Sequence, residues 1–198
     1  MTKPKLKSSI ERIRRADLVE AAYLTFLEFG LSGMTMARIG ERAGMSHGIV
    51  NYYFKGKDEL LSAVVRRANF TIISDTARRL RLARTPRERV SATIAANFTN
   101  DLFTCEIARA WVSYYAAIGK HPEFERLQNA VDHRLASNLR HDLRRLTAPA
   151  RAAETATGVA LLIDGLWLRH AKASDDVGAD EAIRLVEAYV DEKLAGGK

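Results

Sequence analysis

Four aromatic residues and one carboxylate in the second half of the chain could together hold a small organic cation. Trp111, Tyr114 and Tyr115 stand at positions i, i+3 and i+4, so they share one face of a helix. Trp167 lies in a later apolar stretch, and Asp164 precedes it by about one helical turn. A quaternary ammonium group cannot donate a hydrogen bond, so proteins hold it with aromatic faces and a nearby negative charge. The five residues therefore predict a cation-binding site.

Other interpretations of the same residues stay open at this point. Aromatic side chains at helical spacing are often part of a hydrophobic core, and Asp164 could pair with a buried arginine such as Arg109. Asp101 and Glu106 are further candidates for the negative charge of a cation site. Spacing alone does not separate a ligand cage from a core.

A second set of residues, in the first third of the chain, has the spacing of a DNA-reading motif. Residues 35–54 predict two short helices joined by a tight turn at Gly44, with Val50 and Phe54 facing inward. The opposite face of the second helix then exposes four residues: His47, Gly48, Asn51 and Tyr52. Such a face can enter the major groove, where side chains hydrogen-bond to base edges. The alternative is an ordinary helical hairpin.

The charge balance favours DNA binding. The 198 residues include 31 Lys and Arg against 24 Asp and Glu, which gives a formal net charge of +7. Residues 1–67 alone contain 12 basic and 7 acidic residues, and we expect residues 1–15 to form a mobile basic arm. A basic lobe suggests a polyanionic partner, although a high isoelectric point also serves solubility.

Helices must position these residues, because the whole chain has helical periodicity. Apolar residues recur at three- and four-residue spacing, and no segment alternates as a strand would. Capping signals at Thr35, Ser46 and Thr85 help to divide the chain into about nine helices. The sequence therefore predicts an all-α fold with two domains. Residues 1–56 would form a basic arm and helix-turn-helix domain, and residues 57–198 a helical ligand-binding and dimerisation domain.

The apolar pattern also predicts which faces of two helices are buried. Leu18, Ala22, Phe26 and Phe29 should form the buried stripe of the first long helix, and Gly30 should end it. Residues 156–168 are apolar on most sides, so this part of the penultimate helix should be buried all round.

Several protein classes are excluded by what the sequence lacks. The single cysteine, Cys105, forms no intrachain disulfide or CxxC zinc module and is expected to be a small buried apolar residue. No apolar run has the length of a membrane span or follows the N-terminal lysines as a signal peptide would. No HExxH motif or glycine-rich phosphate loop is present. We expect a soluble, cytoplasmic protein that is not an enzyme and has no metal or cofactor.

Residues from Ala16 to about Leu61 resemble the DNA-binding domain of the tetracycline-repressor (TetR) family. The resemblance rests on the helix opened by Thr35, the turn Ala43-Gly44-Met45-Ser46, the run Tyr52-Tyr53-Phe54, and Lys57 at the next helix start. It implies base contacts by four residues: His47, Gly48, Asn51 and Tyr52. It implies phosphate contacts by four others: Thr35, Ser46, Tyr53 and Lys57. Tyr53 could instead pack in the core. Asn51-Tyr52 stands where many family members have Tyr-His, so the resemblance does not predict the operator sequence.

The second half of the chain resembles the choline-responsive BetI branch of the same family. The similar segments are residues 108–115, 124–128, 134–135 and 160–169. The resemblance implies a repressor of genes that convert choline to glycine betaine, with choline as the inducer that releases it from operator DNA. The alternatives are a regulator that senses another cationic or lipophilic molecule, an architectural DNA binder that senses no ligand, and a small-molecule enzyme or carrier, which absence of DNA binding would favour.

The resemblance also implies a homodimer whose last two helices form a four-helix interface. Gly158 and Gly165, seven residues apart, would permit close helix approach, and Ile183 and Val186 would add apolar contacts. A dimer presents two recognition helices about one DNA turn apart and so reads a palindrome. Packing within one chain would explain the glycines equally well.

Overall fold

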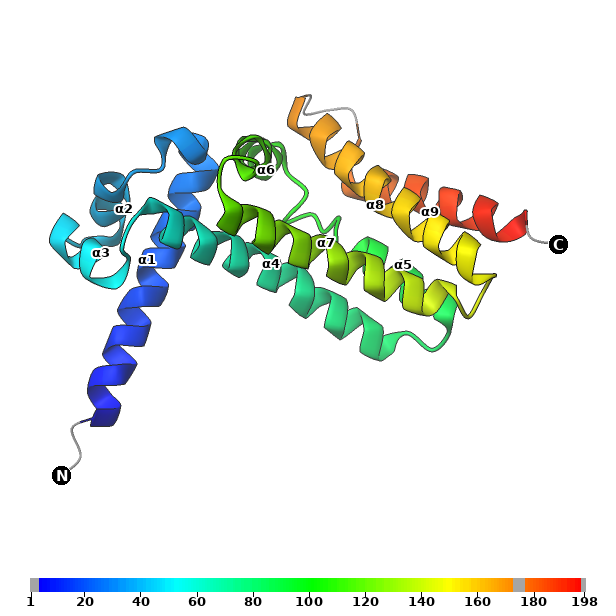
Figure 1. Cartoon of the computed structure of the whole chain (residues 1–198), viewed down its shortest axis with the longest axis horizontal. Coiled ribbons are helices and arrows are strands. Elements are labelled where there is room, and N and C mark those ends of the chain that lie inside the picture. Colours follow the sequence, from blue (N-terminus) through cyan, green and yellow to red (C-terminus); the bar gives the residue numbers. More distant parts are fainter. Residues whose placement is uncertain (1–3, 173–176, 197–198) are drawn as a thin grey trace.

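The protein is all-α in a computed structural model that describes residues 4–172 and 177–196 (Figure 1). These residues form nine helices, which confirms the predicted fold class. The helices are α1 (Pro4–Gly33), α2 (Met36–Ala43), α3 (His47–Tyr53), α4 (Lys57–Leu82), α5 (Pro86–Ala95), α6 (Cys105–Ile118), α7 (Pro122–Leu143), α8 (Pro149–Lys172) and α9 (Ala179–Ala195).

The predicted capping residues begin their helices as expected. The side chains of Thr35 and Ser46 each accept a hydrogen bond from the backbone N–H three residues later, at 3.3 and 3.4 Å. Thr85 and Glu88 form a reciprocal capping box at the start of α5. Gly44 ends α2 in the left-handed conformation, with φ 64° and ψ 30°. Local chemistry therefore fixes these boundaries.

The first helix follows its prediction at Gly30 and differs from it at Phe29. Gly30 (φ 62°, ψ −171°) ends the first helical run of α1, and a short second run follows it directly, where the backbone N–H of Leu31 donates to the Ser113 hydroxyl at 3.0 Å. Phe29 is 41% exposed rather than buried, and the Arg38 guanidinium lies over its ring at 4.5 Å. The residues 1–3 of the predicted basic arm lie outside the described part, and the chain is helical from Pro4.

Two hydrophobic clusters hold the fold together. The first joins α1–α4 and extends into α6 and α7 through Ala110, Tyr114 and Phe124. The second joins α5, α7, α8 and α9. Because residues of both predicted domains share the first cluster, the helix-turn-helix is attached to the rest of the molecule by a continuous core.

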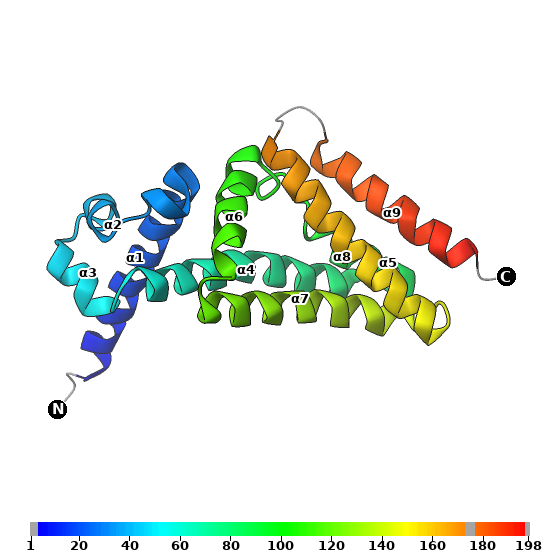
Figure 2. The ribbon, with the colours of Figure 1, turned by 45° about the horizontal axis from the view of Figure 1, so that its top comes forward.

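The helices are arranged so that α6 stands between the two ends of the molecule. Figures 1 and 2 show α1–α3 at one end, α8 and α9 side by side toward the other, and α4 running alongside α7 between them. One side of α6 contacts α1 and another contacts α8. None of the described helices is long and apolar enough to cross a membrane.

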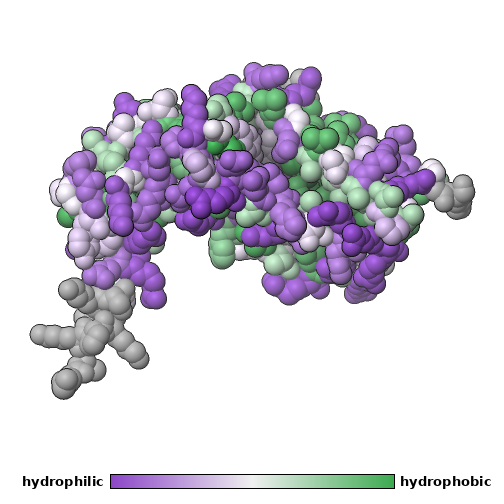
Figure 3. Space-filling view, in the orientation of Figure 1, coloured by the Kyte–Doolittle hydropathy of each residue, from purple (hydrophilic) through white to green (hydrophobic). Residues whose placement is uncertain are grey.

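The penultimate helix, α8, is not buried all round in the single chain. Its inward face is buried, but Leu161 is 66% exposed and Leu168 is 47% exposed. In Figure 3, hydrophobic residues reach the surface in the region where Figure 1 places α8. The expectation of full burial was wrong for one chain, since one apolar face of this helix has no partner within it.

Candidate DNA-binding and ligand-binding sites

The second helix of the helix-turn-helix, α3, is held against α2 by its inward face. Val50 and Phe54 are buried in the first cluster, as the spacing predicts. A side chain at Gly40 would place its Cβ 2.7 Å from the Met45 carbonyl oxygen, so glycine allows the close turn between the helices.

The outward face of α3 carries the four residues expected to reach bases. His47, Gly48, Asn51 and Tyr52 are all exposed. The Asn51 amide nitrogen lies 3.2 Å from Nδ1 of His47, and the Tyr52 ring is 72% exposed. The helix thus presents a polar, sterically open surface of the kind that fits a DNA groove.

The four residues expected to contact phosphates differ in their exposure and in the contacts they already make within the chain. Thr35 and Ser46 are exposed and also cap their helices. Tyr53 is half-buried against the first cluster, with its ring edge-on to Tyr52 at 5.1 Å, so it packs partly in the core, while its phosphate contact stays a prediction. The Lys57 ammonium donates to the Leu31 carbonyl, and burial lowers its pKa. In this conformation Lys57 ties α4 to α1.

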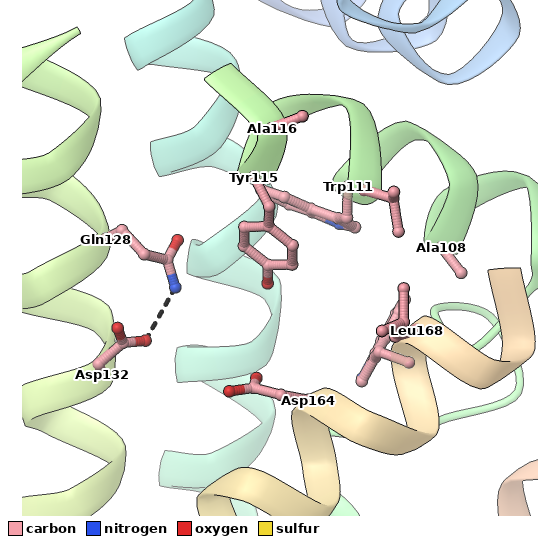
Figure 4. A pocket seen from close by; sticks show the side chains of 10 residues that line it. Ala108, Trp111, Tyr115, Ala116, Gln128, Asp132, Asp164 and Leu168 are labelled. Atoms are coloured by element: carbon pink, nitrogen blue, oxygen red, sulfur yellow. Dashed lines mark hydrogen bonds between the residues drawn. The ribbon is translucent and has the colours of Figure 1, made fainter. Parts of the chain in front are cut away.

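A cavity of about 470 Å³ lies between α6, α7 and α8 (Figure 4). Ten residues line it: Ala108, Trp111, Val112, Tyr115, Ala116, Gln128, Asp132, Asp164, Trp167 and Leu168. Four of the five residues predicted from spacing are therefore brought together. No lysine, arginine or histidine is among the lining residues.

Aromatic rings from two helices form part of the cavity wall. The ring centroids of Trp111 and Tyr115, both on α6, lie 6.1 Å apart, and their ring planes are inclined by 31°. The ring of Trp167 on α8 lies edge-on to that of Phe103, with a centroid distance of 5.1 Å. The Trp111 ring also contacts Phe26 of α1 at 6.0 Å. The same ring therefore touches both the cavity and the helix that supports the DNA-binding end.

The structure places Tyr114 elsewhere. Its side chain is fully buried in the first cluster, and its hydroxyl donates to the Phe124 carbonyl at 3.3 Å. Burial raises the pKa of this phenol to about 12. Tyr114 is a core residue that does not line the cavity, because a residue three positions after Trp111 points toward α7 rather than toward α8.

Two carboxylates face the cavity, from α7 and from α8 (Figure 4). Enclosure by protein, with a smaller contribution from Asp132, raises the pKa of Asp164 to about 6. Burial, with these carboxylates as further causes, also raises the pKa of the Tyr115 hydroxyl, which Figure 4 shows directed into the cavity. The cavity is open to water on one side, so Tyr115, Asp132 and Asp164 are solvent-exposed, whereas Trp111 and Trp167 are half-buried.

The other charged residues considered for the site are not part of it. Arg109 donates to the Ala171 carbonyl at 3.1 Å rather than to Asp164. Asp101 and Glu106 are exposed and do not line the cavity. Cys105 is half-buried, with its thiol donating to the His170 carbonyl at 3.2 Å. The described residues contain no cluster of three or more potential metal ligands.

The residues expected at a dimer interface divide into two groups. A Cβ at Gly158 would lie 1.9 Å from the Tyr189 hydroxyl, so this glycine serves packing of α8 on α9 within the chain. Val186 is fully buried in the second cluster, and Ile183 packs partly against it. Assigning Val186 to the interface was wrong for its side chain, which faces inward. Gly165 has no atom within 4 Å of its Cβ position and faces outward.

Family models match both halves of the chain. Residues 18–64 match a model described as bacterial regulatory proteins of the tetR family, and residues 86–195 match a model described as the C-terminal part of BetI-type transcriptional repressors. This chain is a TetR-family regulator. Its C-terminal domain is of the BetI type, and its N-terminal domain is the DNA-binding domain of the family. The family is not enzymatic, which confirms that expectation.

Full-length relatives support the same assignment. This TetR-family chain is 39% identical over 190 residues to the HTH-type transcriptional regulator BetI of Burkholderia thailandensis, covering 96% of this chain and 97% of that protein. It is 38% identical over the same length to BetI of Paraburkholderia xenovorans. The resemblance to BetI-like repressors is thereby confirmed.

Solved structures share the fold of this TetR-family regulator. A transcriptional regulator from Rhodococcus sp. superimposes with a TM-score of 0.82 at 19% identity, covering 92% of this chain and 96% of that one. A transcriptional regulator from Saccharomonospora viridis, solved in complex with choline, superimposes with a TM-score of 0.76 at 19% identity, covering 89% and 95%. At these identities the likeness concerns the fold.

Two polar residues of the cavity could not be assigned to it from the sequence. Gln128 and Asp132 stand four apart on one face of α7, and the Gln128 amide donates to the Asp132 carboxylate at 2.8 Å. A Gln–Asp pair at this spacing was a signal in the sequence. Its direction toward α6 and α8 depends on how α7 packs, which spacing alone does not give.

Proposed function

We propose that this protein is a homodimeric repressor that binds a palindromic operator and is released from it by choline. The regulated genes would be those that convert choline to glycine betaine. The observation that carries the proposal is the cavity between α6, α7 and α8, which combines aromatic rings from two helices with two carboxylates and no basic lining residue.

The chemistry of the cavity suits a quaternary ammonium ion. A trimethylammonium group offers no hydrogen-bond donor, so aromatic faces and negative charge are its natural partners. Trp111, Tyr115 and Trp167 supply the faces, and Asp164 stands one helical turn before Trp167 on the same helix. The choline-bound regulator from Saccharomonospora viridis and the BetI relatives give independent support.

We propose that α3 reads DNA through the exposed face described above. His47, Gly48, Asn51 and Tyr52 would approach bases. Thr35, Ser46, Tyr53 and Lys57 would contact phosphates, with Lys57 exchanging its contact to α1 for one to the DNA backbone.

The exposed apolar face of α8 supports assembly into a dimer. The exposed Leu161 and the open Gly165 position lie on one side of this helix, and the exposed Leu185 lies on the neighbouring α9. A face of this kind on a regulator is normally covered by a partner. A second copy would cover it and bring two α3 helices to one operator.

Release by ligand requires that choline bind one conformation better than another. The helix α6 is placed to couple the sites, because Trp111 lines the cavity while contacting Phe26 of α1. On the same helix, the Ser113 hydroxyl accepts from Leu31 where α1 is interrupted. A small displacement of α6 would therefore move the support of the helix-turn-helix.

Calorimetric titration tests the ligand directly. The wild-type protein is titrated with choline and with 3,3-dimethylbutan-1-ol, in which a neutral tert-butyl group replaces trimethylammonium. We expect choline to bind more tightly, since both ligands fill the same space but only one is attracted by ring faces and carboxylates. Equal affinities would show that the cavity does not recognise the charge.

A second candidate is a regulator of the same family that senses a larger cation. The cavity volume of about 470 Å³ favours it, because sites of about 300–1,000 Å³ commonly hold ligands larger than choline. Tighter binding of a bulky aromatic cation than of choline in the same titration would favour this alternative.

A further inference from the structure

The cavity carries one more negative charge than a monovalent cation needs. Asp164 is on α8 beside Trp167, whereas Asp132 is on α7, across the cavity from the aromatic helix α6 (Figure 4). No basic side chain lines the space between them. If Asp164 balances the ammonium group, Asp132 remains available for the other end of the ligand.

The α7 wall is built as a polar surface with a fixed orientation. The Gln128 amide donates to one oxygen of the Asp132 carboxylate at 2.8 Å, which holds the carboxylate, and among the described residues no other donor occupies its remaining acceptor positions. The aromatic rings come from α6 and α8. The cavity therefore has an aromatic side for an apolar cation and an acceptor side on α7.

We propose that Asp132 is a specificity-determining residue that accepts a hydrogen bond from the hydroxyl of the ligand and excludes trimethylammonium compounds ending in a carboxylate. This inference rests on the proposed function and assigns the end of the ligand opposite the cation. A hydroxyl donates to a carboxylate, whereas a ligand carboxylate is repelled by it at close range. Selectivity then comes from a repulsive element as well as an attractive one.

The consequence concerns the reaction that consumes the ligand. Oxidation of the hydroxyl group to a carboxylate converts a donor into a negatively charged acceptor while leaving the trimethylammonium group unchanged. A site that recognises both the trimethylammonium group and the hydroxyl group binds the alcohol and excludes the carboxylate formed from it. The regulator would thus report the supply of substrate rather than the accumulation of product.

The test compares two ligands on three proteins by calorimetry: choline and glycine betaine, with wild type, Asp132→Asn and Asp101→Asn. We expect wild type to bind glycine betaine at least about tenfold more weakly than choline. Asp132→Asn should bring the two affinities close together, mainly by improving that for glycine betaine, because the amide can donate to the ligand carboxylate. Asp101→Asn, which removes an exposed carboxylate outside the cavity, should keep the wild-type ratio.

Asp164→Asn separates the selectivity role of Asp132 from the charge-balancing role of Asp164. This variant should lower the affinities for choline and glycine betaine by the same factor. Choline binding with an unchanged ratio in Asp132→Asn would overturn the assignment of Asp132 while leaving the proposed function intact. Absence of choline binding to the wild-type protein would overturn the proposed function and this assignment with it. Circular dichroism of each variant confirms that the fold is retained.

Discussion

Asp164 combines a charge that a cation needs with surroundings that oppose that charge. Enclosure in the cavity and the neighbouring Asp132 raise its pKa to about 6, so the free protein holds this group mostly ionised at pH 7 and mostly protonated at pH 5. A bound cation favours the ionised form and lowers the pKa again. Ligand binding below neutral pH must therefore release a proton.

Choline affinity should depend on pH through this one residue. We expect it to be constant above about pH 7 and to fall up to about tenfold between pH 7 and pH 5, as Asp164 becomes neutral. Calorimetry at several pH values, in buffers of different ionisation enthalpy, measures both the affinity and the proton release. Asp164→Asn should bind weakly and with little pH dependence; a variant that kept the wild-type pH profile would show that another group titrates.

Two residues at the DNA-binding end should respond differently to substitution. Asn51→Ala should cost about 1–3 kcal/mol at the operator and relax base preference, since it removes a side chain that we propose reaches bases. Lys57→Ala should weaken binding to all sequences and reduce the salt slope by about one, since it removes a proposed phosphate contact. Salt titrations on operator and random duplexes measure both effects. Equal losses on both DNAs for both variants would refute the division of roles.

Sequence reasoning found the residues whose chemistry is unusual and missed those whose direction depends on packing. Trp111, Tyr115, Asp164 and Trp167 could be predicted because helical spacing and charge mark them. Tyr114 shares that spacing but is turned into the core by α7. Asp132 and Gln128 were missed because the rotation of α7 is set by tertiary contacts, which no local pattern encodes.

At the scale of elements, helix boundaries were predictable and exposed faces were not. Caps such as Thr85–Glu88 act through hydrogen bonds within a few residues, so the sequence reveals them. The hydrogen bond from Leu31 to Ser113 beside Gly30 joins residues distant in sequence, and the apolar side of α8 is exposed in the single chain. Local patterns reveal neither feature.

Gly165 tests the proposed role of α8 in assembly. Gly165→Arg would place a charged side chain on the open apolar face, so we expect monomers with much weaker operator binding. Sedimentation velocity at micromolar concentration measures the change. A wild-type protein that sediments as a monomer under these conditions would rule out the proposed interface.

Gly158, seven residues earlier on the same helix, provides the contrast. Gly158→Ala gains up to about 1 kcal/mol of helix propensity but must displace Tyr189, and overpacking of this kind costs about 1–3 kcal/mol. We therefore expect a lower melting temperature with the dimer retained, whereas Gly119→Ala, whose added Cβ meets no atom within 4 Å, should not lower stability. Thermal unfolding of the two alanine variants decides the matter, and equal melting temperatures would contradict the close packing seen at Gly158.

At the scale of the whole molecule, the first hydrophobic cluster reaches from the DNA-binding end to one wall of the cavity. The helix α6 contacts α8 beside the cavity and α1 beside the helix-turn-helix, and Trp111 belongs to both contacts. Substituting Trp111 would therefore disturb DNA binding as well as ligand binding. Trp167 and Asp164 are better probes of the ligand alone, because both lie on α8, which belongs to the second cluster and not to the first.

The most direct test is release from DNA by choline, followed by fluorescence anisotropy on a duplex selected in vitro with this protein. We expect choline to release the wild-type protein. The double variant Trp167→Leu with Asp164→Asn should bind the duplex with nearly unchanged affinity but should not be released, because an aromatic face and the counter-charge are both gone. Leucine keeps apolar contact with Phe103, so the fold should be retained. A wild-type complex unaffected by choline, or a double variant released at the same choline concentration as wild type, would contradict the account.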